Sequence, residues 1–142
     1  MTPGLEFTTV SPYLFYPDGD AAAAWLIRVL GFGPARSVRG PGGGWAEGEV
    51  AIGAGARVDI SGGSGGPGAP AARGQGALLI VGVTDVDAQY RRIRAAGIDL
   101  EPPQDEPYGP RTCHVTDPWG YRWYFWQGQA TFPAGPGPAA GG

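Results

Sequence analysis

The chain has 142 residues, a length typical of one domain or of two small modules that share a core. Its net charge of -3 provides no basic field for nucleic acid, and no apolar run reaches the ~18 residues that span a bilayer. The single cysteine, Cys113, excludes an internal disulfide and indicates a reducing compartment. The opening MTPGLEFTTV lacks the pattern of a secretion signal, so we expect a cytoplasmic protein.

Glycine and proline are concentrated in three segments, although the chain as a whole contains 27 Gly and 15 Pro. GPGGG at 40–44 is typical of a hairpin loop, 61–76 of a flexible linker and 133–142 of a frayed tail. We therefore expect a first module over residues 1–62, a linker over 63–76, a second module over 77–128 and a disordered tail over 129–142.

The first half begins with a short apolar run, YLFY, which predicts a buried strand. Asp18 or Asp20 can then cap a helix, which Gly31 ends. The apolar stripe of this helix comprises Ala22, Leu26, Val29 and Leu30. Three strands are predicted after it, at about 34–39, 45–52 and 56–61.

The second half repeats this order. LLIVGV predicts a strand, and Asp85 or Asp87 can cap a helix that Gly97 ends. The apolar stripe of this helix comprises Val86, Tyr90, Ile93 and either Ala95 or Ala96. Strands are predicted at about 100–102, 110–116 and 121–127, with a turn at DPWG.

The two halves are related by a nearly constant offset. Asp18, Asp20 and Ala21 match Asp85, Asp87 and Ala88 at an offset of 67, Gly31 matches Gly97 at 66, and Arg57 matches Arg122 at 65. A register that slips slowly, with the same order of elements, is what duplication with small loop deletions leaves. The sequence thus predicts an α+β fold built from two βαβββ modules.

A doubled βαβββ unit with VTDPWGYRWYF before its last strand resembles the vicinal oxygen chelate superfamily, which includes glyoxalase I, extradiol dioxygenases, fosfomycin-resistance enzymes and bleomycin-resistance proteins. The resemblance covers about residues 7–127, and its most specific pieces are VGVTDVDAQYRRIRAAGI and DPWGYRW. The segment SPYLFYPDGDAAAAWLIRVLGFG is similar to the glyoxalase-like subgroup that lacks an obvious metal site. The resemblance implies curled mixed sheets that form a ligand-holding cup, often within a homodimer.

The resemblance also implies where a metal would sit. The four ligand positions of the family's enzymes correspond here to Ser11, Asp59, Leu78 and Tyr124. Only Asp59 is a suitable ligand, because a neutral hydroxyl binds divalent ions poorly, leucine has no donor and a tyrosine would need a strongly lowered pKa. We therefore expect no metal and no cofactor.

Strand alternation assigns the residues that line the cup. If Asp59 and Tyr124 point inward, their neighbours on alternate positions do so too, while Trp123 and Phe125 face the helices. Trp45 and Tyr108 lie in or beside loops and could close the rim, as could Trp119. The inward set predicted in this way is Ser11, Tyr13, Phe15, Arg57, Asp59, Leu78, Ile80, Arg122, Tyr124 and Trp126.

A lining of rings and guanidinium groups suits a flat, conjugated ligand, since rings stack and arginine can stack or pair with an anion. The first hypothesis is therefore a metal-independent homodimer that sequesters a hydrophobic aromatic small molecule, for example an antibiotic in a resistance role. The alternative is a glyoxalase- or dioxygenase-like lyase or isomerase that uses Asp59 or His114 as base or metal ligand. Neither hypothesis involves nucleic acid or a membrane.

Overall fold

A computed structural model describes residues 4–62 and 77–131 of the chain. The predicted linker at 63–76 and most of the predicted tail lie outside the described residues. Neither helix in the described ranges is long and apolar enough to cross a lipid bilayer.

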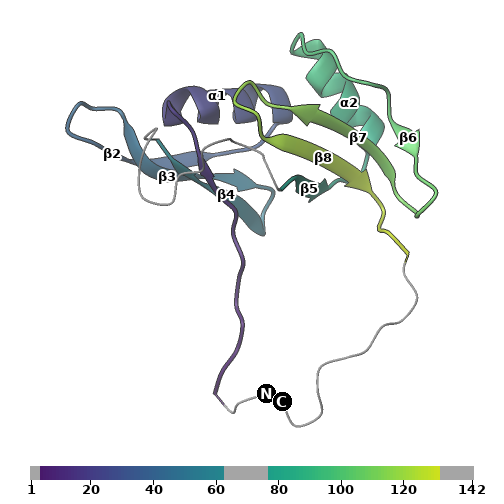
Figure 1. Cartoon of the computed structure of the whole chain (residues 1–142), viewed down its shortest axis with the longest axis horizontal. Helices are drawn as coiled ribbons and strands as arrows, with labels where there is room; N and C mark the ends of the chain where they lie inside the picture. The colour runs from purple at the N-terminus through teal and green to yellow at the C-terminus, as the bar shows by residue number, and fades with distance from the viewer. Residues whose placement is uncertain (1–3, 63–76, 132–142) are drawn as a thin grey trace.

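The first module contains β1 (Tyr13–Phe15), α1 (Gly19–Leu30), β2 (Ala35–Arg39), β3 (Trp45–Ile52) and β4 (Ala56–Ser61). Its four strands form an open sheet in the order β1-β4-β3-β2. The β1 strand runs parallel to β4, and the other neighbours are antiparallel. The helix α1 lies against this sheet (Figure 1).

The second module repeats the arrangement with β5 (Leu79–Gly82), α2 (Val86–Ala95), β6 (Gln104–Asp105), β7 (Arg111–Thr116) and β8 (Arg122–Gln127). Its sheet has the order β5-β8-β7-β6, again with one parallel pair, between β5 and β8. The equivalent strands occupy equivalent places in the two sheets. The prediction of two βαβββ modules in an α+β fold is confirmed.

The two helices begin and end at the residues that the repeat picks out. The carboxylate of Asp18 accepts a hydrogen bond of 3.0 Å from a backbone N–H of the first turn of α1, and Asp85 does the same for α2. The other aspartate of each pair, two residues further on, lies in the first turn. Gly31 and Gly97 have φ angles of 80° and 89°, which a glycine adopts without strain after the last helical turn.

One predicted strand is wrong. The segment 100–102 is not a strand, and the corresponding edge strand β6 is displaced to the two residues Gln104 and Asp105, which pair with Thr112 and Arg111. Pro102 and its neighbouring proline explain the displacement, because proline has no N–H to give to a ladder.

The apolar faces of both modules meet in one core. The predicted stripe of α1 is buried, as are Val86 and Ile93 of α2, whereas Tyr90 and Ala96 are partly buried against the core and Ala95 is exposed. Phe32, which follows α1, lies with its ring centroid 5.4 Å from that of Trp123 and 6.5 Å from that of Phe125 on β8. Gln89 of α2 donates a hydrogen bond of 3.0 Å to the carbonyl of Leu30. The modules therefore pack as one body.

Asp117, in the DPWG turn, is a second link between the modules. This carboxylate is 3% exposed. Its Oδ1 accepts from the backbone N–H groups of Trp119 and Tyr121 at 3.0 Å each. Its Oδ2 accepts from the Tyr16 hydroxyl at 2.7 Å and from the Trp123 indole at 3.2 Å. One buried carboxylate thus fixes the turn before β8 and ties β8 to the end of β1.

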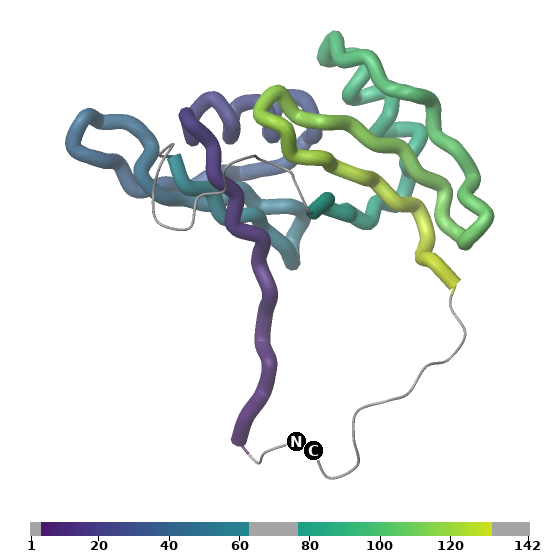
Figure 2. The backbone as a smooth tube through the Cα atoms, in the orientation of Figure 1, coloured from purple at the N-terminus to yellow at the C-terminus, as the bar shows by residue number. Residues whose placement is uncertain are grey.

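The N-terminal residues form an extended arm. Figure 2 shows that the segment before β1 extends away from the body of the molecule. Leu5, Phe7 and Val10 on this arm are 48%, 89% and 96% exposed. In a single chain, these three large apolar side chains are therefore exposed to solvent.

Candidate ligand-binding site

Each sheet has one face against its helix and one face turned away from it, and we call the second the cup face. On the first sheet, Leu14, Val58 and Ile60 are buried toward α1. The strand register aligns the intervening residues into two rows across the cup face. These rows are Tyr13–Asp59–Glu49–Arg36 and Phe15–Ser61–Glu47–Val38.

The second sheet follows the same rule. On β8, Trp123 and Phe125 are completely buried, whereas Tyr124 and Trp126 are partly exposed and Arg122 is exposed. The β8 strand therefore has large rings on both faces because one set fills the core and the other covers the cup face. The rows on this cup face are Ile80–Tyr124–His114 and Gly82–Trp126–Thr112–Gln104.

A hollow of about 470 Å³ lies on the cup face of the first module. Tyr13, Val38, Glu47 and Asp59 are among the residues that line it. The Tyr13 ring meets the Phe15 ring edge to face at a centroid distance of 5.1 Å. The Tyr13 hydroxyl donates a hydrogen bond to the Glu47 carboxylate, and this bond raises the pKa of Tyr13 above its ordinary value.

A smaller hollow of about 190 Å³ lies on the cup face of the second module. His114 and Tyr124, which line it, stack with a centroid distance of 4.7 Å and an interplanar angle of 14°. The Glu106 carboxylate at its edge accepts a hydrogen bond of 2.8 Å from the Thr112 hydroxyl. Each module therefore carries its own polar and aromatic surface.

Beside the second hollow, Tyr108 lies against Trp126 with a ring centroid distance of 5.7 Å. Tyr108, in the turn before β7, is 42% exposed. Partial burial raises the pKa of the Tyr108 phenol, with a smaller contribution from Glu106. Tyr108 therefore lies next to Trp126, one of the residues of the cup-face rows.

The arginines of the cup face are engaged by neighbours. Arg57 pairs with Asp59, and Arg36 pairs with Glu49, each at 3.2 Å. Arg122 donates a hydrogen bond of 3.1 Å to the carbonyl of Ala77. The guanidinium groups at Arg57 and Arg122 that the sequence suggested as partners for a ligand therefore already have partners within the chain.

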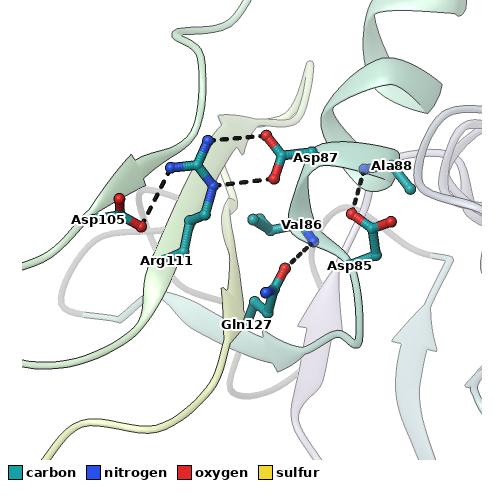
Figure 3. A network of polar contacts seen from close by, with 7 residues as sticks. All are labelled: Asp85, Val86, Asp87, Ala88, Asp105, Arg111 and Gln127. Carbon is teal, nitrogen blue, oxygen red and sulfur yellow. Dashed lines mark hydrogen bonds and ion pairs between the residues drawn. The ribbon is translucent and has the colours of Figure 1, made fainter.

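Most of the remaining arginines serve the helices and the sheet edges. Figure 3 shows Arg111 between Asp87 of α2 and Asp105 of β6, with its ion pairs at 3.0 and 3.3 Å. In the same region, the Gln127 side chain accepts a hydrogen bond of 3.0 Å from the backbone N–H of Val86. These contacts hold α2 on its sheet and place Arg111 away from the cup-face rows.

The structure also places the other predicted residues. Ser11 is half-buried just before β1, and Leu78 is 41% exposed just before β5. Ile80, on the cup face of β5, is 52% exposed. Glu47 and Glu49 were not predicted as site residues, although their alternation on β3, opposite Ser61 and Asp59 of β4, was a usable signal.

Trp45 does not close the rim as predicted. It is 8% exposed and donates a hydrogen bond of 3.0 Å from its indole to the carbonyl of Ile60. A Cβ on Gly19, Gly48 or Gly62 would overlap the indole or its backbone, so these glycines form the slot that holds it. Strict alternation from Glu47 and Glu49 would put Trp45 on the cup face, but the register between β2 and β3 shifts between Val38 and Arg39, beside Trp45, and its side chain is buried in the core.

The four positions implied for a divalent metal do not form a ligand set. Asp59 lines the first hollow and is paired with Arg57, whereas Tyr124 lines the second hollow and stacks on His114. Leu78 has no donor atom. Within residues 4–62 and 77–131, no three His, Cys, Asp or Glu side chains gather in a way that could hold a metal ion. The donor chemistry present does not fit the metal of the family's enzymes.

Comparison with known proteins identifies the family. The family model of the glyoxalase/bleomycin resistance protein/dioxygenase superfamily matches residues 7–125. The chain belongs to this superfamily. The superfamily assignment agrees with the doubled βαβββ order and with the DPWG turn that precedes β8. No curated protein sequence matches the chain.

Solved structures show the same fold. TioX from Micromonospora sp. ML1 is 33% identical, with a TM-score of 0.68 over 87% of this chain and all of that chain. TnmS3, an antibiotic binding protein from Streptomyces sp. CB03234, is 22% identical, with a TM-score of 0.65 over 88% of this chain and all of that one. A bleomycin-binding protein complexed with bleomycin is 20% identical, with a TM-score of 0.62 over 87% of the present chain and all of the bleomycin-binding chain.

Proposed function

We propose that this superfamily member is a metal-independent binding protein that sequesters a hydrophobic aromatic small molecule, with an antibiotic as the leading candidate. The observation that carries the proposal is the ring-covered cup face, with Tyr13 and Phe15 on one module and Tyr124, Trp126 and Tyr108 on the other. Offset or edge-to-face contacts with a ligand ring each add about 0.5–1.5 kcal/mol beyond the area buried. The antibiotic-binding proteins among the structural neighbours support the same class of ligand.

The proposal favours binding over turnover because the Asp59 carboxylate, one of the two candidate bases, pairs with Arg57 at 3.2 Å. A lyase or isomerase that used Asp59 as a base would first have to break this ion pair. The other candidate, His114, packs its ring face to face on Tyr124, an arrangement that suits a ring-stacking surface. The lone thiol of Cys113 fits a cytoplasmic location, where thiols stay reduced.

The proposal includes a homodimer in which a second copy completes each cup. The first hollow is lined only by residues of the first module and the second hollow only by residues of the second. Val38, Leu78 and Ile80 are exposed beside these hollows, and the arm presents Phe7 and Val10. Joining the first cup face of one copy to the second cup face of another would cover these side chains and enclose a ligand between rings.

Tryptophan fluorescence titration tests the binding proposal. The probes are three planar tricyclic compounds: neutral acridone, cationic proflavine and anionic 9-anthracenecarboxylate. We expect saturable quenching by at least one probe, and an affinity about three- to tenfold lower in Tyr124→Leu. The matched control is Tyr90→Leu, which removes a tyrosine ring from α2, behind the sheet, and should leave the affinity within about twofold.

Failure of all three probes to bind the wild-type protein would contradict the proposal. Equal losses in Tyr124→Leu and Tyr90→Leu would also contradict it, because binding would then not depend on the cup face.

Sedimentation velocity tests the dimer separately. We expect twice the mass of one chain, and the double variant Phe7→Ser with Val10→Ser should shift the equilibrium toward single chains. A wild-type protein that sediments as one chain at all concentrations would rule out the shared cup.

A further inference from the structure

From the charges of the cup face, we propose that the bound aromatic molecule carries a positive charge, and that Glu47 is the residue that selects it. This inference rests on the proposed function, because it names the chemical class of the ligand of the same site. It differs from the expectation drawn from the sequence, in which arginines would attract an anionic group. The register and ion pairs of β2, β3 and β4 provide the new information.

The first hollow contains one more carboxylate than the neighbouring guanidinium groups can neutralise. Glu47, Glu49 and Asp59 line it. Arg36 pairs with Glu49 and Arg57 pairs with Asp59. Among the described residues, no arginine lies within ion-pair distance of Glu47. The exposed Glu47 carboxylate is therefore the charge that remains for a ligand.

The rings beside Glu47 favour the same sign of ligand charge. Tyr13 is 44% exposed, and its hydroxyl donates a hydrogen bond to Glu47. A cation within about 6 Å of a tyrosine or phenylalanine ring face is attracted by the ring quadrupole. A positively charged ring system that packs on Tyr13 would therefore meet an aromatic ring beside the Glu47 carboxylate.

The second hollow is also lined by negatively charged side chains, and this observation is independent of the first hollow. Glu101 and Glu106 line it together with His114 and Tyr124. No arginine is among its lining residues. Both halves of the proposed cup thus present excess negative charge next to aromatic rings, one through Glu47 and the other through Glu101 and Glu106.

An anionic ligand would bind this hollow with lower affinity. It could reach Arg57 or Arg36 only by competing with Asp59 or Glu49 for a guanidinium group at 3.2 Å. It would also lie close to Glu47 in a hollow of about 470 Å³, where like charges repel. A cation has neither difficulty, so the cup should discriminate between aromatic molecules of similar size by their charge.

The test compares proflavine with 9-anthracenecarboxylate and acridone at low ionic strength. In the wild-type protein we expect proflavine to bind at least about tenfold more tightly than 9-anthracenecarboxylate. Glu47→Gln should weaken proflavine binding about fivefold or more and leave acridone binding within about twofold. Raising the salt concentration should reduce the preference for proflavine, since exposed charges are screened.

Asp99→Asn is the matched control. It removes one negative charge from a fully exposed carboxylate that pairs with Arg94 after α2, away from the cup-face rows. It should leave proflavine affinity within about twofold, which separates a local effect of Glu47 from the change in net charge. Both variants change exposed side chains, and equal thermal unfolding midpoints will show that each one folds.

The outcomes are distinguishable. Equal affinity for proflavine and 9-anthracenecarboxylate, or equal effects of Glu47→Gln and Asp99→Asn, would overturn the cation proposal and leave the binding function standing. Absence of binding by every probe would overturn the proposed function itself, and the cation proposal with it.

Discussion

Replacing Asp117 by alanine tests whether one buried carboxylate joins the modules. The change removes an acceptor that serves four donors: two backbone N–H groups of the turn, the Tyr16 hydroxyl and the Trp123 indole. Tyr16 and Trp123 are completely buried, so water reaches them only if the core opens. At about 1 kcal/mol for each buried donor that loses its acceptor, we expect a loss of about 3–5 kcal/mol in the free energy of unfolding.

Two milder variants set the scale. Tyr16→Phe removes one of the four donors and should cost about 1 kcal/mol. Asp117→Asn keeps one oxygen for the backbone donors but turns an NH₂ group toward Trp123, whose indole can only donate, so we expect an intermediate loss of about 1–3 kcal/mol. The order of stability should be wild type, Tyr16→Phe, Asp117→Asn and then Asp117→Ala.

Urea unfolding, followed by tryptophan fluorescence and by circular dichroism, measures these differences. The two signals should coincide in the wild-type protein if both modules unfold together. For a chain of this length, the loss in Asp117→Ala corresponds to a decrease of roughly 10 °C in the midpoint of thermal unfolding. A loss below about 1 kcal/mol in Asp117→Ala would refute the assignment of Asp117 as the link.

Three further predictions concern the packing and charges around the site. Gly48→Ala should destabilise the protein by about 2 kcal/mol or more in urea unfolding, because the new Cβ would overlap Trp45 and the carbonyl of Arg36; a neutral result would contradict the glycine slot. The Cys113 thiol, whose pKa burial raises to about 11, should react with a thiol reagent at pH 8 only after unfolding; rapid labelling of the folded protein would contradict its burial. Hydrogen bonds from Arg111 lower the pKa of Asp87, so its stabilising effect is present above the ordinary aspartate pKa of about 3.9 and is lost as pH falls through the lower folded value. The difference in thermal midpoint between the wild-type protein and Asp87→Asn should therefore shrink below about pH 4, and a constant difference would contradict the pairing.

Local sequence signals were sufficient for the helices and for most strands. Asp18 and Asp85 cap the helices because a carboxylate before an apolar stripe has backbone donors to accept from, and Gly31 and Gly97 end them because they tolerate positive φ. The alternation of β8 also assigned its core and cup faces correctly. These features depend on neighbours within a few residues, which the sequence displays directly.

Features that depend on pairing between strands were harder to predict. Trp45 looked like a rim residue because it follows a glycine-rich loop, yet the slot formed by Gly19, Gly48 and Gly62 holds it in the core. Glu47 was overlooked because its importance appears only when the register shows that the neighbouring carboxylates are paired with arginines and Glu47 is not. The short edge strand β6 was misplaced because prolines moved it along the chain.

A crystal structure of the protein soaked with acridone would test the central claim most directly, since this neutral probe reports on the rings and is insensitive to charge. The expected result is a planar ring on the cup face, with its centroid about 4.5–7 Å from the rings of Tyr13 or Tyr124. A probe bound in the groove between the helices, near Arg28 and Arg91, with the cup faces empty or closed against each other, would contradict it.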